Sequence, residues 1–107
     1  MESKRQKQVG KLIQKDLGDI FLRDIKSIFE DDFVTITDVK VSPDLSIAKV
    51  YLSFLKGEKR NEILESIRDN SKKIRGLFGN KAKHQLRIIP TFQFYNDDTA
   101  EYAQKIE

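Results

Sequence analysis

The hydrophobic residues of the first 29 positions follow a helical spacing. Successive apolar residues recur at steps of three or four, with occasional adjacent pairs, which places them on one stripe of an amphipathic helix. This stripe predicts a helix from about Lys4 to Phe29, ended by the acidic run at residues 30–32. Gly18 lies inside it and indicates either close packing or a tolerated cost of up to roughly 1 kcal/mol relative to alanine. The stripe consists of Val9, Leu12, Ile13, Leu17, Ile20, Phe21, Ile25, Ile28 and Phe29.

The next two segments have the composition of β-strands. Residues 33–41 are rich in β-branched and aromatic side chains, and residues 47–55 alternate between a purely apolar and a mixed set of positions. Such alternation is typical of a sheet that is covered on one side only. The Ser-Pro-Asp-Leu sequence at 42–45 suits a turn, because proline fixes φ and aspartate hydrogen-bonds its own backbone. These features predict a β-hairpin with Ala48, Val50, Leu52 and Phe54 on its apolar face.

A second helix and a third strand are predicted in the second half of the chain. Apolar residues at helical spacing run from Ile63 to Phe78, with Asn61 as the capping candidate and Gly79-Asn80 as the C-terminal stop. Residues 85–95 predict a strand with Leu86, Ile88, Phe92 and Phe94 on one face. Pro90 lacks an N–H donor, which places this strand at a sheet edge or at a bulge.

The predicted order is therefore α-β-β-α-β in the α+β class, with two helices on one face of a three-stranded sheet and a single core. We expect one domain over residues 1–96 and a short C-terminal tail over residues 97–107. The tail is expected to form a short helix, since Asp98 and Glu101 have capping-box spacing.

Composition excludes several classes of protein. The chain has 107 residues, a length that fits one domain, and contains no cysteine, which excludes disulfides and thiolate metal sites. No apolar run approaches the roughly 20 residues that span a bilayer. The basic N-terminus is not followed by the apolar segment of a signal peptide. We therefore expect a cytoplasmic protein that does not bind membranes.

Catalytic chemistry has little support in the sequence. His84 is the one histidine, and no G-x-S-x-G or Walker-type loop is present. A lone histidine between Lys83 and Gln85 is more often a surface residue than a general base. The acidic pairs 31–32 and 97–98 are more often caps or solubilising charge than cation ligands. We expect no enzyme activity, no catalytic residue, no metal or other cofactor, and no small-molecule substrate.

The charge distribution points to RNA more than the formal net charge of +3 does. Basic residues crowd the first turns of the first helix and recur from residue 72 to residue 87 without an intervening acid. Segregated charge creates a one-sided potential that attracts a polyanion, the alternative being ordinary solvated helix faces. Arginine offers forked donors to phosphate and lysine a mobile point charge. The RNA-binding candidates are Lys4, Arg5, Lys7, Lys11, Lys72, Lys73, Arg75, Lys81, Lys83 and Arg87.

Residues 76–79 form a G-x-x-G, the loop with which KH domains clamp a nucleic-acid backbone. Its central residues, Leu77 and Phe78, are neither small nor basic, and Phe78 continues the helical stripe. We therefore interpret this motif as a helix end packed into the core. No aromatic pair of the RNP type is evident on the strands, so we expect recognition of RNA backbone or shape over base stacking.

Two separated motifs resemble the ribosome-binding factor A family. The first is residues 34–55 (VTITDVKVSPDLSIAKVYLSFL). The second is residues 74–79 (IRGLFG), followed by residues 86–90 (LRIIP) and 92–97 (FQFYND). The resemblance covers nearly the whole chain and implies a type II KH-like fold. It also implies a kink in the second helix in place of the G-x-x-G loop. The matching position often holds Ala-x-Gly in the family and holds Asn70-Ser71-Lys72 here.

The resemblance implies a function in ribosome biogenesis. Members of the family bind the small (30S) ribosomal subunit late in its assembly, contact 16S rRNA near the decoding region during rRNA processing, and are linked to growth in the cold. The implied partners are 16S rRNA and the free small subunit, with the chain as a monomer. Two alternatives stay open. One is a generic single-stranded RNA-binding KH-like module, and the other is a protein-interaction module that uses the hairpin, Phe33 or the third-strand edge.

Overall fold

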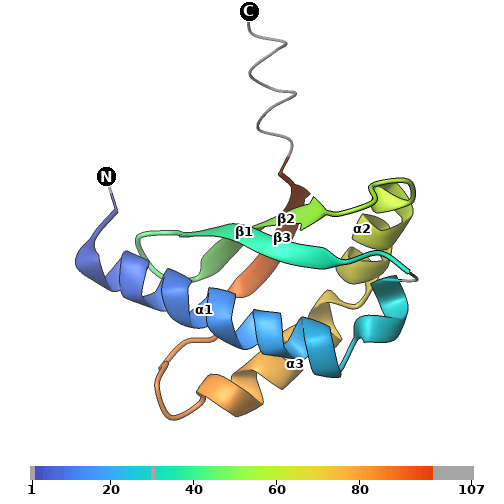
Figure 1. Cartoon of the computed structure of the whole chain (residues 1–107). Helices are drawn as coiled ribbons and strands as arrows, with labels where there is room; N and C mark the ends of the chain where they lie inside the picture. The colour runs from blue at the N-terminus through green and yellow to red at the C-terminus, as the bar shows by residue number, and fades with distance from the viewer. Residues whose placement is uncertain (1, 30, 98–107) are drawn as a thin grey trace, which may run out of the picture.

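The computed structural model describes residues 2–29 and 31–97. The helices of this part of the chain lie on one side of a three-stranded sheet, and no described helix covers the other side (Figure 1). The predicted α-β-β-α-β fold is confirmed, with the second helix divided in two; the helix expected from Asp98 lies outside the described residues. The elements are α1 (Lys4–Arg23), the 3-10 helix η1 (Lys26–Phe29), β1 (Val34–Val41), β2 (Ile47–Phe54), α2 (Arg60–Asp69), α3 (Ser71–Ala82) and β3 (Thr91–Asn96).

Helix α1 ends at Arg23, so the prediction of one helix to Phe29 is wrong at its C-terminal end. The N-terminus is fixed by a capping box between Ser3 and Gln6. After Arg23 the chain tightens into η1, which buries Phe29, and Ile25 just before η1 is also fully buried. The Phe29 ring meets Phe21 edge to face at a centroid distance of 5.2 Å. Apolar spacing cannot separate an α-helix from a helix followed by a 3-10 turn when both bury the same residues.

The sheet has the order β1-β2-β3, with β1 antiparallel to β2 and β3 parallel to β2. The predicted hairpin is confirmed, and the hydroxyl of Ser42 donates to the Asp44 carboxylate at 2.7 Å in its turn. The alternate residues of β2 from Ala48 to Leu52 are fully buried, as the apolar pattern predicts. The largest fully buried side chains of the core are Phe78, Phe94, Ile13, Leu17, Ile20, Ile25, Leu52, Ile63, Ile67 and Ile74.

Helix α1 covers the free edge of β1. As an outer strand, β1 leaves alternate backbone carbonyl groups without a strand partner. Gln6 Nε2 donates to the carbonyl oxygen of Val41 at 2.8 Å, and Gln14 Nε2 donates to that of Ile36 at 3.0 Å. Two side chains of one helix therefore satisfy the strand edge and fix the helix along it.

The second helix is interrupted at Asn70, as the family resemblance implies. The backbone of Asn70 (φ −100°, ψ 14°) leaves the helical region, and its Nδ2 donates to the carbonyl oxygen of Ser66 at 2.8 Å. This side-chain bond satisfies a carbonyl group at the end of α2. Lys59, not Asn61, is the N-terminal cap residue of α2 and makes no side-chain cap bond there, so the capping prediction is wrong.

The third strand starts at Thr91, six residues later than predicted. Pairing begins where the N–H of Thr91 donates to Ser46, directly after Pro90, which has no N–H to donate. Ile88, predicted to face the core, is 57% exposed, whereas Leu86 is buried. β3 is an outer strand, as expected from Pro90.

Two arginines cover the free edge of the third strand and its approach. The guanidinium of Arg68 donates twice to the carbonyl oxygen of Phe94, at 3.1 and 2.7 Å. That of Arg75 donates to the carbonyl oxygens of Pro90 at 3.0 Å and Ile89 at 2.7 Å. The break at Asn70 lies between these arginines, and each half of the divided helix supplies one of them.

A carboxylate joins the start of β1 to the loop after β2. Asp32 accepts hydrogen bonds from the backbone N–H groups of Phe33, Lys56 and Gly57 at 2.8, 2.8 and 3.1 Å. Partial desolvation alone raises the pKa of Asp32, but these three donors and the charge of Lys56 outweigh it and hold the pKa below 3.8.

Substituting Gly10 or Gly18 by alanine tests which of the two glycines is needed for close packing and which is only tolerated within the helix. A Cβ on Gly10 would lie 3.2 Å from the carbonyl oxygen of Val39, whereas a Cβ on Gly18 meets nothing within 4 Å. We expect Gly18→Ala to raise the free energy of unfolding by up to about 1 kcal/mol, through helix propensity and a less flexible unfolded chain. Gly10→Ala should lower it by about 1 kcal/mol or more, because the strand backbone has to move. Urea unfolding measures both, and equal stabilisation by the two variants would contradict close docking of α1 on β1.

The Asp32 contacts predict a pH-dependent contribution to stability. A carboxylate whose folded pKa is lowered stabilises the fold above its unfolded pKa of about 4 and loses that contribution as pH falls through the folded value. Asp32→Asn should therefore lower the urea midpoint at pH 7 and make a much smaller difference at pH 3. Asp31→Asn is the control, since this exposed side chain should change stability by less than about 0.5 kcal/mol at either pH. A pH-independent effect of Asp32→Asn would contradict the assignment.

Candidate nucleic-acid interface

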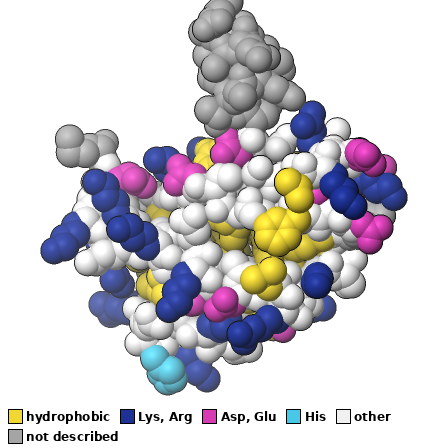
Figure 2. All heavy atoms as spheres, in the orientation of Figure 1, with side chains coloured by type: hydrophobic (Ala, Val, Ile, Leu, Met, Phe, Trp, Pro, Cys, Tyr) yellow, Lys and Arg dark blue, Asp and Glu magenta, His cyan; other side chains and the backbone are white. Residues whose placement is uncertain are grey.

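All ten predicted RNA-binding residues are exposed. Lys4, Arg5, Lys7 and Lys11 lie on the first half of α1, whereas the other six lie on α3 or in the loop after it. Figure 2 shows Lys and Arg side chains along the left and lower rims of the face that carries α1, and a further group at the right. The structure thus leaves every predicted side chain accessible to a ligand.

Arg5 and Arg87, one from each basic segment, line the same groove. This groove has a volume of about 170 Å³, and its other lining residues include Leu45 and the largely exposed Ile88. Leu45 occupies the hairpin turn in a left-handed conformation (φ 65°) and packs against the core. Two guanidinium groups beside an apolar floor can hold phosphate oxygens and an uncharged ribose or base together.

Lys72 and Lys73 lie apart from this groove. They stand in the first turn of α3, and Lys83 directly follows the helix. At 1.5 Å per residue, roughly 16 Å of helix separates Lys72 from Lys83. The basic candidates on α3 and directly after it therefore lie toward the two ends of the helix and do not form one patch.

Two candidates make contacts within the protein. Arg75 directs part of its guanidinium to the carbonyl oxygens before β3, and the remaining N–H groups are left for a phosphate. Lys81 Nζ lies 4.0 Å from the Asp19 carboxylate on α1. An exposed pair at this distance contributes little to stability, so Lys81 can exchange it for another anion.

The G-x-x-G sequence lies inside α3 and is not a loop. Phe78 is fully buried, as predicted, and its ring meets Phe92 edge to face at 5.3 Å. The expected helix end at Gly79-Asn80 is wrong, because α3 continues to Ala82. A helical conformation at Gly76 and Gly79 leaves no exposed loop to clamp a nucleic-acid backbone.

The open face of the sheet carries an aromatic pair that the sequence analysis did not find. Tyr51 of β2 and Tyr95 of β3 are register partners, and their rings stack at a centroid distance of 5.6 Å and an angle of 28°. The expectation that no such pair exists on the strands is therefore wrong. Tyr51 was visible as a member of the mixed face of residues 47–55, but its pairing with Tyr95 depends on a parallel register that no local pattern encodes.

The described residues show no centre for metal chemistry or membrane insertion. In residues 2–29 and 31–97, no three His, Asp or Glu side chains converge in a metal-binding arrangement. His84 is exposed, as expected. None of the helices in this part of the chain is long and apolar enough to cross a membrane.

Comparisons with known proteins identify relatives over the whole chain. A model of the family described as ribosome-binding factor A matches residues 5–107. Ribosome-binding factor A of Cytophaga hutchinsonii is 45% identical over 107 residues, which are 100% of this chain and 80% of that protein.

Solved structures show the same fold. A Thermotoga maritima protein, a candidate ribosome binding factor A studied by solution NMR, is 31% identical with a TM-score of 0.63, covering 89% of each chain. A homology model of Thermus thermophilus ribosome binding factor A, fitted into a cryo-EM map of a 30S complex, gives a TM-score of 0.62 at 17% identity, covering 89% of this chain and 93% of that one. The family match, the identity and the shared fold agree, and the chain belongs to the ribosome-binding factor A family.

Proposed function

We propose that this protein binds the free small (30S) ribosomal subunit and contacts 16S rRNA during late assembly and rRNA processing. The observation that carries the proposal is the family match over residues 5–107. It is supported by the Thermus thermophilus ribosome binding factor A, of which a homology model was fitted into a cryo-EM map of a 30S complex. In this proposal the protein is a cytoplasmic monomer without a catalytic site or cofactor, and it is linked to growth in the cold. Residues 1–96 form its KH-like RNA-binding domain and residues 97–107 its tail.

In this proposal the protein binds RNA through basic side chains and not through a glycine-containing loop. Lys4, Arg5, Lys7 and Lys11 project from α1, and Arg87 joins Arg5 in the shared groove. Phosphate contacts of this kind fix the position and register of a protein on folded RNA, whereas sequence is read only through the bases. Helices α1 and α3 are packed on the core behind these side chains, so the backbone positions from which the basic side chains extend are fixed.

A protein-interaction function is favoured by one other feature. Phe33 and Leu55, at the open end of the hairpin, are 53% and 77% exposed. They lie opposite each other, since the N–H of Leu55 donates to the carbonyl oxygen of Phe33 at 3.0 Å. Exposed apolar pairs of this kind often mark protein contacts. A contact of this surface with a ribosomal protein would be compatible with small-subunit binding. A contact with a protein outside the ribosome would instead give the chain a function other than small-subunit binding.

Sedimentation of cell extract through a sucrose gradient tests the proposed partner. The protein should migrate with free small subunits and be absent from translating ribosomes, and this association should fall as salt rises, because phosphate contacts release counterions. A profile confined to the top fractions at low salt would contradict the proposal. Spreading over all ribosomal fractions would favour the generic RNA-binding alternative.

Charge reversal tests which surface contacts RNA. If the basic surface makes about four phosphate contacts, log affinity for purified small subunits should fall against log salt with a slope of roughly −3. The double variant Arg5→Glu, Arg87→Glu should weaken binding and bring the slope to roughly −1.5. Arg23→Glu with Lys26→Glu makes the same change in net charge at exposed positions near the other end of α1 and should bind like the wild type. Equal losses in the two variants would show that only net charge matters and would contradict a defined surface.

A further inference from the structure

We propose that the open face of the sheet is a second RNA-binding surface, which stacks an unpaired base on the Tyr51–Tyr95 pair and holds its phosphate between Lys40 and Lys49. This surface is distinct from the basic helices and from the Arg5–Arg87 groove. Binding of single-stranded RNA to it would be an activity in its own right. It does not depend on whether the RNA belongs to a ribosome.

The register of the three strands brings these side chains together. Lys40 of β1 is the partner of Lys49 of β2, which is in turn the partner of Gln93 of β3. Two residues further along β2, Tyr51 is the partner of Tyr95. Side chains two residues apart on a strand share a face and lie roughly 7 Å from each other. The lysine row and the tyrosine row are thus within reach of the phosphate and the base of one nucleotide.

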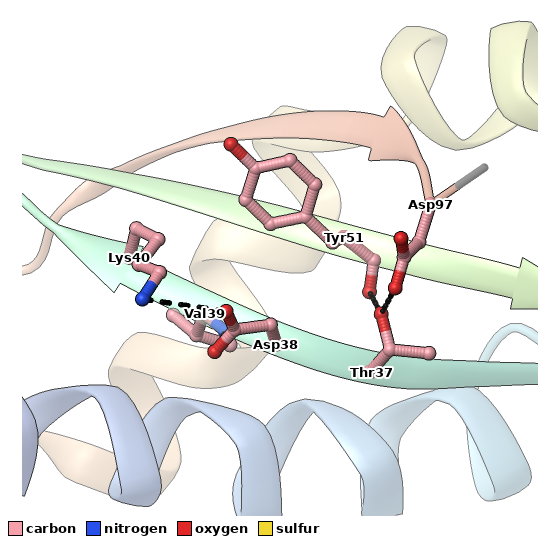
Figure 3. Close-up of polar contacts among 6 residues, drawn as sticks. All are labelled: Thr37, Asp38, Val39, Lys40, Tyr51 and Asp97. Atoms are coloured by element: carbon pink, nitrogen blue, oxygen red, sulfur yellow. Dashed lines mark hydrogen bonds and ion pairs between the residues drawn. The ribbon is translucent and has the colours of Figure 1, made fainter. Parts of the chain in front are cut away.

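The tyrosine rings form a preset stacking surface. Figure 3 shows the Tyr51 ring standing on the side of the sheet away from the helices. Its neighbour is held in orientation, because the Tyr95 hydroxyl donates to Gln93 Oε1 at 2.9 Å. Aromatic rings on a sheet stack unpaired bases with little regard to sequence, since every base has a π face.

Lys40 and Lys49 lie directly opposite each other on neighbouring strands, which is unfavourable for the sheet itself. Like charges directly opposite each other on neighbouring strands destabilise a sheet. Lys40 Nζ lies 3.5 Å from the Asp38 carboxylate, whereas Lys49 forms no ion pair within residues 2–29 and 31–97. Both lysines line a groove of about 360 Å³ together with Ser42, Ile47 and Gln93. An anion in this groove would relieve the repulsion between the two ammonium groups.

Three acids lie on or next to this face: Asp44 in the hairpin turn, Asp38 beside Lys40, and Asp97 after the tyrosine row. A bulge in β1 makes Asp38 the partner of Tyr51, and the adjoining Thr37 hydroxyl bonds the Asp97 carboxylate (Figure 3). The two lysines thus form one row of this face, with the Asp44 carboxylate held by Ser42 and Ser46 in the turn, and with Asp38 and Asp97 on the other side of that row. A phosphate placed between the two lysines leaves the base beside the tyrosines, one same-face row further along the strands.

The same turn connects the proposed surface with the other basic groove. Leu45 lines the Arg5–Arg87 groove, while Ser42 and Ile47, at the two ends of the turn, line the lysine groove. A strand of RNA that passes around the turn can contact both. The neighbours of the tyrosines on this face, such as Ser53 and Gln93, are polar, which fits an RNA strand better than the apolar centre of a protein interface.

Titration with hexauridylate, an RNA without secondary structure, tests the proposal. The chain has no tryptophan and three tyrosines, so quenching of tyrosine fluorescence reports stacking, and anisotropy of a labelled oligonucleotide reports affinity. Tyr51→Leu with Tyr95→Leu should weaken binding about tenfold or more, whereas Tyr51→Phe with Tyr95→Phe should keep affinity within about threefold, because stacking needs only the ring.

The lysine pair gives a test that does not disturb the half-buried tyrosines. Lys40→Gln with Lys49→Gln should weaken binding about tenfold and reduce the magnitude of the salt slope by roughly 1 to 1.5, and Lys15→Gln with Lys26→Gln is the control of equal charge. Wild-type affinity of the lysine pair variant, or of a folded leucine pair variant, would overturn the proposal, as would an equal loss in the control. If the leucine pair variant unfolds, the result of the lysine pair variant decides.

Sedimentation of the same variants separates this surface from the ribosomal function. Loss of hexauridylate binding with unchanged sedimentation on small subunits would support this surface independently of the ribosomal function. Unchanged hexauridylate binding with lost sedimentation would reject this surface as the site of single-stranded RNA binding.

Discussion

The unpaired backbone at the two edges of a three-stranded sheet is the constraint on which the rest of the structure depends. An outer strand cannot leave its carbonyl groups buried without donors, and this sheet has two outer strands and only one inner one. Gln6 and Gln14 supply donors to β1, and Arg68 and Arg75 supply them to β3 and the residues just before it. The helices therefore cover the edges with side-chain donors while their apolar stripes cover the inner face.

Because some basic side chains hydrogen-bond the strand edges, the basic residues are not all equally available to a ligand. Arg75 stands in the basic segment from residue 72 to residue 87, yet much of its guanidinium is used by carbonyl groups of the protein. Lys4, Lys7 and Lys11 make no ion pair within residues 2–29 and 31–97 and remain available. Because the helices of residues 2–29 and 31–97 all lie on one side, no described helix covers the other side of the sheet, and the outward residues of the strands form a surface of their own (Figure 1).

Features that depend on local periodicity could be predicted from the sequence. The alternation from Ala48 to Phe54 identified the inward face of β2, and the stripe that ends in Phe78 identified a buried helical residue inside an apparent loop motif. Periodicity could not reveal the break at Asn70, because Ile67 and Ile74 are two helical turns apart and are buried on both sides of it. Nor could it place Tyr51 against Tyr95, since that contact is set by a parallel register between strands joined through two helices.

Chemical footprinting of 16S rRNA in free small subunits tests the central claim most directly, namely that this fold binds the subunit through the Arg5–Arg87 surface. With saturating protein, we predict that one compact set of nucleotides loses reactivity, and that the Arg5→Glu, Arg87→Glu variant leaves them reactive at the same concentration. An unchanged reactivity pattern with the wild-type protein, or full protection by the variant, would contradict the account.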